Sequence, residues 1–131
     1  MKLVNRLICF FFLSVCTFAT SAQNYPTKPV KLMVGAGAGG GTDIIARMLA
    51  EKMAESLKGT FIVENKPGAT GALGVRYVTK SKADGYTLLL GQTGEMIINP
   101  LVTKDLGYDS FHAFKSIALV GEVPLILSAP G

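Results

Sequence analysis

The spacing of apolar positions changes along this chain, and each spacing predicts a different element. Residues 30–34 form a short, mainly apolar run between a proline and a glycine, which predicts a buried strand. From residue 42 to residue 57 the apolar positions recur in steps of three and four, which predicts an amphipathic helix. We expect Thr42 or Asp43 to cap its start and Gly59 to lie just past its end.

The same alternation continues toward the carboxyl terminus. The expected elements are a strand over 60–64, a helix from about 70 to about 80, a strand over 86–90, a helical stretch near 96–101, and one or two strands within 114–127. Strands that alternate with helices predict an α/β fold with a parallel sheet covered on both faces. The loops 35–42, 65–71 and 91–94 then lie at the carboxyl ends of three strands, where open α/β sheets bind ligands.

The first of these loops, Gly35–Thr42, carries a glycine-rich turn directly before a helix. Such a turn leaves backbone N–H groups and the positive end of a helix dipole free to bind an anion. Gly35, Gly37 and Gly40 also fit the dinucleotide pattern G-x-G-x-x-G, with Glu64 where a ribose-binding acid would stand. A dinucleotide-binding oxidoreductase domain is therefore the alternative function, and a tight structural turn without a ligand is the simplest alternative of all.

A triphosphate-binding loop is excluded by the same residues. Its pattern requires lysine at the position that Gly41 occupies, so the main cation for a triphosphate is missing.

The first 22 residues have the pattern of a secretory signal peptide. Lys2 and Arg6 precede an apolar run of 13 residues, and small residues lead up to an expected cleavage after Ala22. A retained anchor is the alternative, but a membrane-spanning helix needs about 20 apolar residues. Lipid attachment at Cys16 is a further alternative. A signal peptide argues against a nicotinamide cofactor, because these cofactors are largely intracellular.

Removing this segment changes the composition of the chain. Both cysteines lie within it, so the mature chain has no thiol for a disulfide, a nucleophile or a metal. Lys2 and Arg6 leave with it, which lowers Lys+Arg from 13 to 11 against nine acidic residues, and the net charge from +4 to +2. The remaining lysines are scattered, whereas a nucleic-acid surface needs a basic cluster. We therefore expect no nucleic-acid partner.

The mature chain also lacks the residue combinations that catalysis requires. No histidine stands beside a plausible serine nucleophile, and no carboxylates and histidines have metal-ligand spacing. We expect no enzyme activity, no cofactor and no metal. Among single residues, Asp43 is expected to cap its helix and pair with Arg47, Glu95 to be exposed, and the lone His112 to be packed.

Five ordered motifs resemble one known family. They are YPTKPV at 25–30, GGGTDIIAR at 39–47, ENKPGATG at 64–71, DGYTLL at 84–89 and INP at 98–100. Together they resemble the substrate-binding receptors of tripartite tricarboxylate transporters, the Bug proteins. The resemblance implies a periplasmic, Venus-flytrap protein of the type II periplasmic-binding-protein class. Residues 23–115 would be its first α/β lobe, incomplete here, and 116–131 the start of the crossover into a second lobe, so the chain is expected to be a fragment.

The resemblance also implies a ligand and the groups that hold it. Members bind a small organic carboxylate through backbone N–H groups and water at helix N-termini, and they deliver it to membrane transporter subunits as monomers. Without the second lobe, binding is expected to be impaired. The implied ligand-binding residues here are Ala38, Gly39, Gly40, Gly41, Thr42, Asp43, Gly68, Ala69, Thr70, Gly71, Gln92, Thr93 and Gly94.

Overall fold

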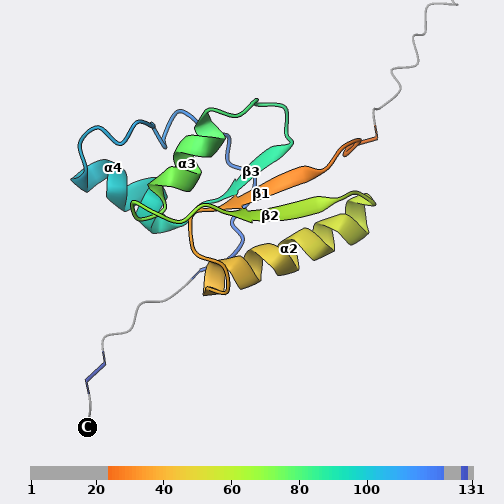
Figure 1. The fold of residues 1–131 in the computed structure, drawn as a ribbon, viewed down its shortest axis with the longest axis horizontal. Coiled ribbons are helices and arrows are strands. Elements are labelled where there is room, and N and C mark those ends of the chain that lie inside the picture. The colour runs from red at the N-terminus through yellow and green to blue at the C-terminus, as the bar shows by residue number, and fades with distance from the viewer. Residues whose placement is uncertain (1–23, 123–127, 130–131) are drawn as a thin grey trace, which may run out of the picture.

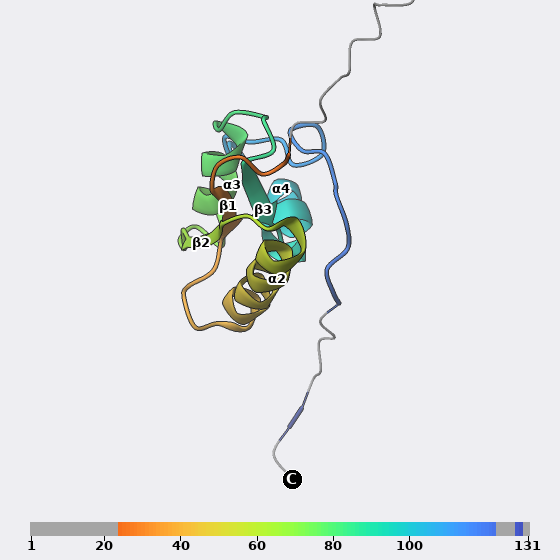
Figure 2. The same ribbon diagram turned by 90° about the vertical axis from the view of Figure 1, so that its right-hand side faces the viewer.

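A three-stranded parallel sheet lies between two helices in the computed structural model, which describes residues 24–122 and 128–129 (Figure 1). The sheet has the order β2-β1-β3, with α2 on one face and α3 on the other (Figure 2). The α/β class and the coverage of both faces are therefore confirmed. The elements in chain order are β1 (Val30–Val34), α2 (Gly41–Leu57), β2 (Phe61–Asn65), α3 (Ala72–Thr79), β3 (Thr87–Leu90), the π-helix η1 (Gly94–Ile98) and α4 (Asn99–Val102).

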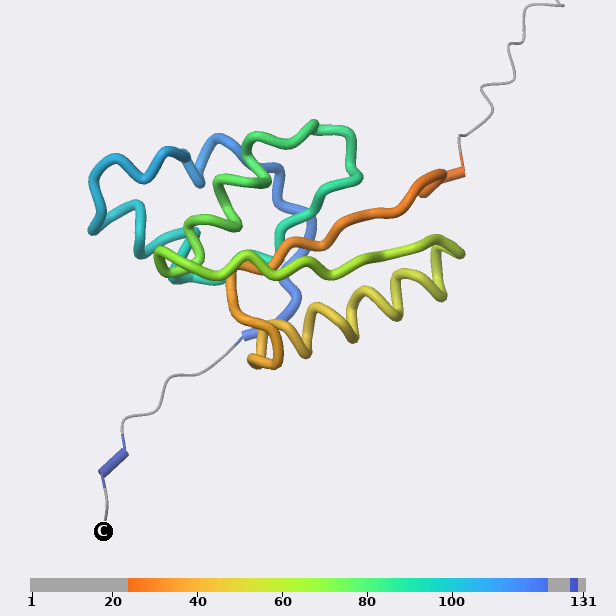
Figure 3. The backbone as a smooth tube through the Cα atoms, in the orientation of Figure 1, coloured from red at the N-terminus to blue at the C-terminus, as the bar shows by residue number. Residues whose placement is uncertain are grey.

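The register places all three carboxyl ends at one edge of the sheet. Val34, the last residue of the central strand, is level with Asn65 of β2 and with Leu90 of β3. The loops that follow the strands therefore leave from the same edge, as the alternation of strands and helices predicts (Figure 3).

The helix α2 covers one face of the sheet through small side chains. Ala46 and Ala50 are buried against Leu32 and Val34 of the central strand, which lets the helix lie close to the sheet. The predicted cap is wrong: Gly40 holds the N-cap position in an extended conformation, and no side chain caps the helix. The Asp43 carboxylate does not cap it because other donors already bind it, as described below.

The helix α3 covers the other face, where Met33 of β1 and Val75 of α3 are both fully buried. It is shorter than the predicted helix over about 70–80. It begins only at Ala72, because the four residues before it have positive φ, which no right-handed helix contains; these are Gly68, Ala69, Thr70 and Gly71.

The segment after β3 forms a π-helical turn that continues into α4, where Pro100 lies within the helix. Proline has no N–H, so residue 100 supplies no donor to the carbonyls four and five residues earlier, on Met96 and Glu95. Two side chains from the following segment supply it instead. The Ser110 hydroxyl donates to the Met96 carbonyl at 2.6 Å, and the Tyr108 hydroxyl donates to the Glu95 carbonyl at 2.6 Å. Tyr108 and Ser110 therefore hold this segment against the helix through carbonyls to which Pro100 cannot donate.

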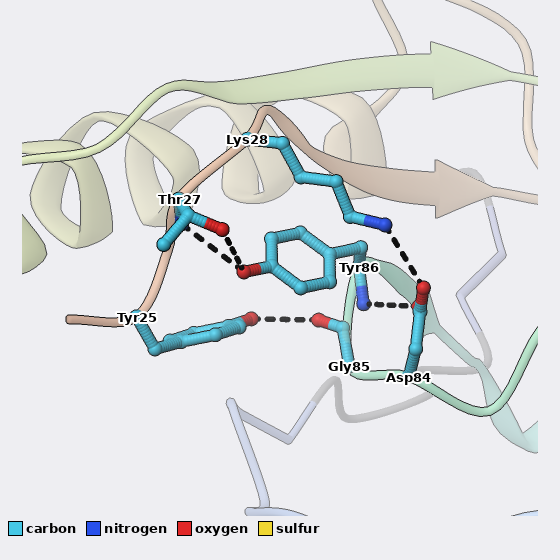
Figure 4. A network of polar contacts seen from close by, with 6 residues as sticks. All are labelled: Tyr25, Thr27, Lys28, Asp84, Gly85 and Tyr86. Carbon is cyan, nitrogen blue, oxygen red and sulfur yellow. Dashed lines mark hydrogen bonds and ion pairs between the residues drawn. The ribbon is translucent and has the colours of Figure 1, made fainter. Parts of the chain in front are cut away.

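At the amino ends of the strands, a polar network fixes the start of the described chain (Figure 4). The Tyr25 hydroxyl donates to the Gly85 carbonyl at 2.6 Å, and Lys28 pairs with Asp84 at 3.0 Å. The same Lys28 ammonium lies 4.2 Å from the centre of the Tyr86 ring. A hollow of about 460 Å³ beside this network is lined by residues that include Lys28, Lys31, Lys80 and Lys82, at the edge opposite the three loops.

The prediction of strands within 114–127 is wrong over 114–122, which form no strand. Apolar side chains there are exposed, including Ile117 at 80% and Leu119 at 79%, and no neighbouring strand pairs with this stretch in the described part of the chain. A run of apolar residues becomes a strand only when a partner edge binds its backbone. Residues 123–127 and the predicted signal peptide lie outside the described residues.

No helix in the described part of the chain has the length and apolar character needed to cross a membrane.

Candidate functional site

At the carboxyl edge of the sheet (Figure 3), the first two loops touch each other, and Glu95, just after the third loop, contacts both. A methyl group added to Gly35, the first residue after β1, would lie 2.9 Å from the Gly71 Cα and 3.1 Å from Glu95 Oε1. A methyl group added to Gly74 would lie 3.0 Å from the Gly35 Cα. Backbones approach this closely only when no Cβ separates them, so glycine is required at these positions.

The first loop, residues 35–40, is anchored by the Asp43 carboxylate. Oδ2 accepts the Gly39 N–H at 2.8 Å and pairs with Arg47 Nε at 2.9 Å, while Oδ1 accepts the Asn65 side-chain amide at 3.0 Å. The Arg47 bond is the first cause of the low pKa of Asp43, which falls from 3.8 to about 2, and the bonds from Gly39 and Asn65 follow. The predicted pairing of Asp43 with Arg47 is confirmed.

This arrangement engages both Asp43 oxygens within the protein. The residue is 2% exposed, so its carboxylate stabilises the loop and leaves only its backbone N–H for a ligand. Asn65 completes the anchor, because its amide also donates to the Ala36 carbonyl at 3.2 Å. Asn65 is absent from the predicted site residues. Its place at the carboxyl end of β2, beside the first loop, was the available signal.

Part of the predicted backbone donor set is already bonded. Within the first loop, the Gly39 N–H donates to Asp43 and the Gly40 N–H to the Gly37 carbonyl at 3.4 Å. Among the described residues, the amides of Ala38, Gly41 and Thr42 donate no hydrogen bond. The last two belong to the first turn of α2, a helix of 17 residues whose dipole points its positive end at this edge.

The second loop contains a left-handed turn over Gly68–Gly71. The φ angles are +123, +48, +53 and +85 degrees, and two successive bonds run from the Gly71 N–H to the Gly68 carbonyl and from the Ala72 N–H to the Ala69 carbonyl. Left-handed geometry costs a residue with a side chain about 1–2 kcal/mol, which applies to Ala69 and Thr70. The Asn99 side chain holds the turn by donating to the Thr70 carbonyl at 3.0 Å.

The turn is therefore strained and fixed, a combination that occurs at ligand-binding segments. Of its four predicted donors, the Gly71 N–H is consumed internally. The Ala69 and Thr70 amides donate no hydrogen bond within the described residues.

The third loop, residues 91–93, leads into η1, whose Glu95 carboxylate contacts Gly35 of the first loop and Gly71 of the second. The Gln92 N–H donates to Glu95 Oε1 at 3.2 Å, so this predicted donor is also bonded. Glu95 is only 4% exposed, which contradicts the expectation of an exposed side chain. The carboxylate folds back to the Gln92 N–H three residues before it, as the acidic residue of a capping box does. That spacing could have indicated this bond.

Burial raises the pKa of Glu95, because an ionised carboxylate is less well solvated there; the Gln92 N–H bond opposes the shift. A methyl group added to Gly71 would lie 2.5 Å from Glu95 Oε2, so this glycine makes room for the carboxylate.

Three further polar side chains, those of Thr93, Lys66 and His112, form no hydrogen bond between the loops within the described residues. Thr93 is exposed at the start of the helical stretch. The Lys66 ammonium lies 4.5 Å from the centre of the Tyr77 ring. The prediction that His112 is packed is wrong, because its side chain is 86% exposed and bonds Asp109 Oδ2 at 2.8 Å. No group of three metal-ligating side chains occurs among the residues that the structure covers.

Chemically, this edge offers backbone N–H groups and a helix N-terminus. Such a site suits an anion whose oxygens accept several N–H bonds.

Comparison with known proteins identifies the relatives of this chain. Residues 45–131 match the family described as "Tripartite tricarboxylate transporter family receptor". A UPF0065 protein of Bordetella bronchiseptica is 36% identical over 122 residues, which cover 93% of this chain and 36% of that protein. Protein BugT of Bordetella pertussis is 36% identical over 108 residues, 82% of this chain and 33% of BugT. The chain thus spans about a third of the length of these relatives.

Solved structures agree with the sequence relatives. The periplasmic binding protein BugD aligns with a TM-score of 0.65 and 42% identity, over 69% of this chain and 30% of BugD. MatC from Rhodopseudomonas palustris with bound malate aligns with a TM-score of 0.70 and 31% identity, over 73% of this chain and 33% of MatC. R. palustris Rpa4515 with adipate aligns with a TM-score of 0.64 and 38% identity, over 66% of this chain and 29% of Rpa4515.

These relatives confirm the predicted family resemblance and the lobe of a periplasmic-binding-protein fold. They are receptors and binding proteins, so the prediction that the chain is not an enzyme is confirmed as well. The oxidoreductase alternative based on Gly35, Gly37 and Gly40 is thereby wrong.

Proposed function

We propose, since the chain belongs to the family of tripartite tricarboxylate transporter receptors, that its three loops bind a small organic carboxylate in the periplasm. Residues 1–22 would act as the signal peptide that directs export, with cleavage after Ala22. The bound solute would pass to membrane transporter subunits, and the receptor would act as a monomer. The periplasmic relatives support this location.

One observation carries the proposal: the amides left unbonded belong to loops that touch. Ala38, Gly41 and Thr42 in the first loop and helix start, and Ala69 and Thr70 in the second loop, are in the predicted donor set and donate no bond among the described residues. The contact of Gly35 with Gly71 holds these two groups of donors together. A carboxylate is the ligand that such a set of N–H donors favours.

The chemistry of two neighbours narrows the ligand class. Adipate and malate, bound in Rpa4515 and MatC, are both dicarboxylates. We therefore propose a dicarboxylate or tricarboxylate for this chain, with one carboxylate group held by the loop amides.

Affinity depends on how much water the site excludes. A carboxylate at an exposed helix terminus gains about 0.3–1 kcal/mol. Hydrogen bonds to a charged group are worth about 1.5–3 kcal/mol each where water is excluded. Residues 116–131 are proposed as the start of the crossover to a second lobe, which would close over the ligand. With one lobe, we expect weak binding, and sub-micromolar affinity of this 131-residue chain for any carboxylate would contradict that expectation.

The test is a titration of the chain with malate, adipate and citrate, in which binding is measured from the changes in amide chemical shifts. Gly41→Pro removes one proposed donor at a position where proline is compatible with a helix, since the preceding Gly40 is already extended. Gly41→Ala is the matched control, because it keeps the N–H and its Cβ meets nothing within 4 Å.

We expect malate or adipate to shift the unbonded amides of both loops. Gly41→Pro should weaken binding about two- to fivefold, as the loss of about 0.3–1 kcal/mol at an exposed helix terminus requires, whereas Gly41→Ala should bind as the wild type does. Binding that both variants leave unchanged, or shifts confined to other surfaces, would refute the site.

A further inference from the structure

We propose that protonated Glu95 donates a hydrogen bond to the bound ligand, so that carboxylate binding is coupled to the uptake of one proton by this side chain. This inference rests on the proposed function, and it adds a side chain to a site built otherwise from backbone groups.

The position of Glu95 places it at the junction of all three loops. Its Oε1 accepts the Gln92 N–H of the third loop at 3.2 Å and would lie 3.1 Å from a methyl group on Gly35 of the first. Its Oε2 lies against Gly71 of the second loop, where a methyl group would approach to 2.5 Å. Glu95 thus lies where the first two loops meet, and we place one carboxylate group of the ligand beside it.

The charge around Glu95 makes the ionised form costly. Within the described residues no lysine, arginine or histidine pairs with it, in contrast to Asp43, which has Arg47. The titratable group that packs against its turn is Tyr108, whose hydroxyl donates to the Glu95 backbone carbonyl. Arg76 of α3 does not pair with Glu95 and donates instead to the Leu106 carbonyl. Burial raises the Glu95 pKa even before a ligand is present.

An anionic ligand increases this cost. Two ionised carboxylates at hydrogen-bond distance repel, so one of them must take up a proton from solvent. A protonated Glu95 keeps Oε1 as acceptor for Gln92 and carries its O–H on Oε2, where it can donate to a ligand oxygen. The repulsion is thereby replaced by a short, charge-assisted hydrogen bond from the Glu95 O–H to the ligand carboxylate. No covalent bond within the ligand changes.

The coupling has a definite sign. At pH values below the Glu95 pKa of the free protein, the proton is already present, and this side chain gives affinity no pH dependence. Above that pKa, binding must take a proton from solvent, so affinity falls by up to about tenfold for each unit of pH. The substitution Glu95→Gln supplies a permanent donor of similar shape and removes the dependence.

The experiment measures malate and adipate affinity between about pH 6 and 8, where both ligands are doubly ionised, for the wild type, Glu95→Gln and Glu64→Gln. Glu64 is the matched control, because it is a partly exposed carboxylate that pairs with Lys31 at 2.7 Å. We expect the affinity of the wild type and of Glu64→Gln to fall up to about tenfold for each unit of pH, and that of Glu95→Gln to remain constant.

A second measurement does not depend on the variant folding correctly. The side-chain carboxyl ¹³C shift of Glu95 is titrated in the wild type with and without malate, and its pKa should rise when malate is bound. Equal pH slopes in the wild type and Glu95→Gln, or a Glu95 pKa that malate leaves unchanged, would overturn this inference alone. Absence of carboxylate binding at every pH would overturn the proposed function and this inference with it.

Discussion

Pro100 and Ser110 form a pair whose energetic coupling can be measured. Ser110→Ala removes the hydroxyl that donates to the Met96 carbonyl at 2.6 Å, and Ser110 is itself buried. The carbonyl then loses its donor, and Pro100 cannot replace it because it has no N–H. A buried polar group left without a partner costs about 1–3 kcal/mol. In a domain of roughly 60–100 residues each kcal/mol lowers Tm by about 4–8 °C, so the expected fall is about 4–24 °C.

Pro100→Ala should reduce that cost. The new N–H at position 100 lies four residues after Met96 and can donate to the same carbonyl. The Ser110→Ala penalty in the Pro100→Ala background should therefore be smaller by about 1 kcal/mol, a typical coupling for groups in contact. Effects of proline on the unfolded chain appear in both arms of the double-mutant cycle and cancel.

Urea unfolding of the four proteins measures the coupling. Ser81→Ala is the matched control, because the Ser81 hydroxyl also donates to a backbone carbonyl, that of Tyr77 at 2.9 Å, with no proline involved. Its cost should be the same whether it is introduced into the wild type or into Pro100→Ala. Strict additivity between Pro100→Ala and Ser110→Ala would refute the account of this helix.

Three further predictions concern the loops. Gly71→Ala should destabilise by at least about 1–2 kcal/mol in urea unfolding, because φ is +85 degrees and the new methyl meets the Glu95 carboxylate, whereas Gly37→Ala, with open space around it, should be nearly neutral. Asp43 has a pKa of about 2 against 3.8, so its stabilisation is present above about pH 4 and is lost as pH falls toward 2; acid unfolding of Asp43→Asn should lack this component. The pKa of Glu95 is raised in the folded protein, so stability falls as pH rises through that pKa. The stability of Glu95→Gln relative to the wild type should therefore be greater at about pH 7.5 than at about pH 4.5, and an equal difference at both pH values would contradict this sign.

The sequence predicts most of the sheet and its helices, because those elements depend on local periodicity. The bounds of β1 agree with the prediction, and α2 begins one residue earlier than expected. The common edge of the three loops follows from connectivity alone. Parallel strands all run in the same direction, so the loops that follow them leave from the same edge of the sheet. These features require no knowledge of distant side chains.

The features that were missed depend on distant partners. Glu95 is buried where Gly35 and Gly71 approach it, and two carbonyls of the π-helical turn accept bonds from hydroxyls 13 and 14 residues further along the chain. The strand expected over 114–122 has no partner strand to bind its backbone within the described part of the chain. Periodicity cannot report any of these contacts, because each one joins residues that the sequence separates.

The contact between Gly35 and Gly71 has an evolutionary consequence. A receptor that recognises the shared acid group of its solutes through main-chain atoms can replace the side chains around that contact without losing recognition. Only the glycines that permit the close approach would resist substitution, and new selectivity would arise on the surrounding, freely variable positions.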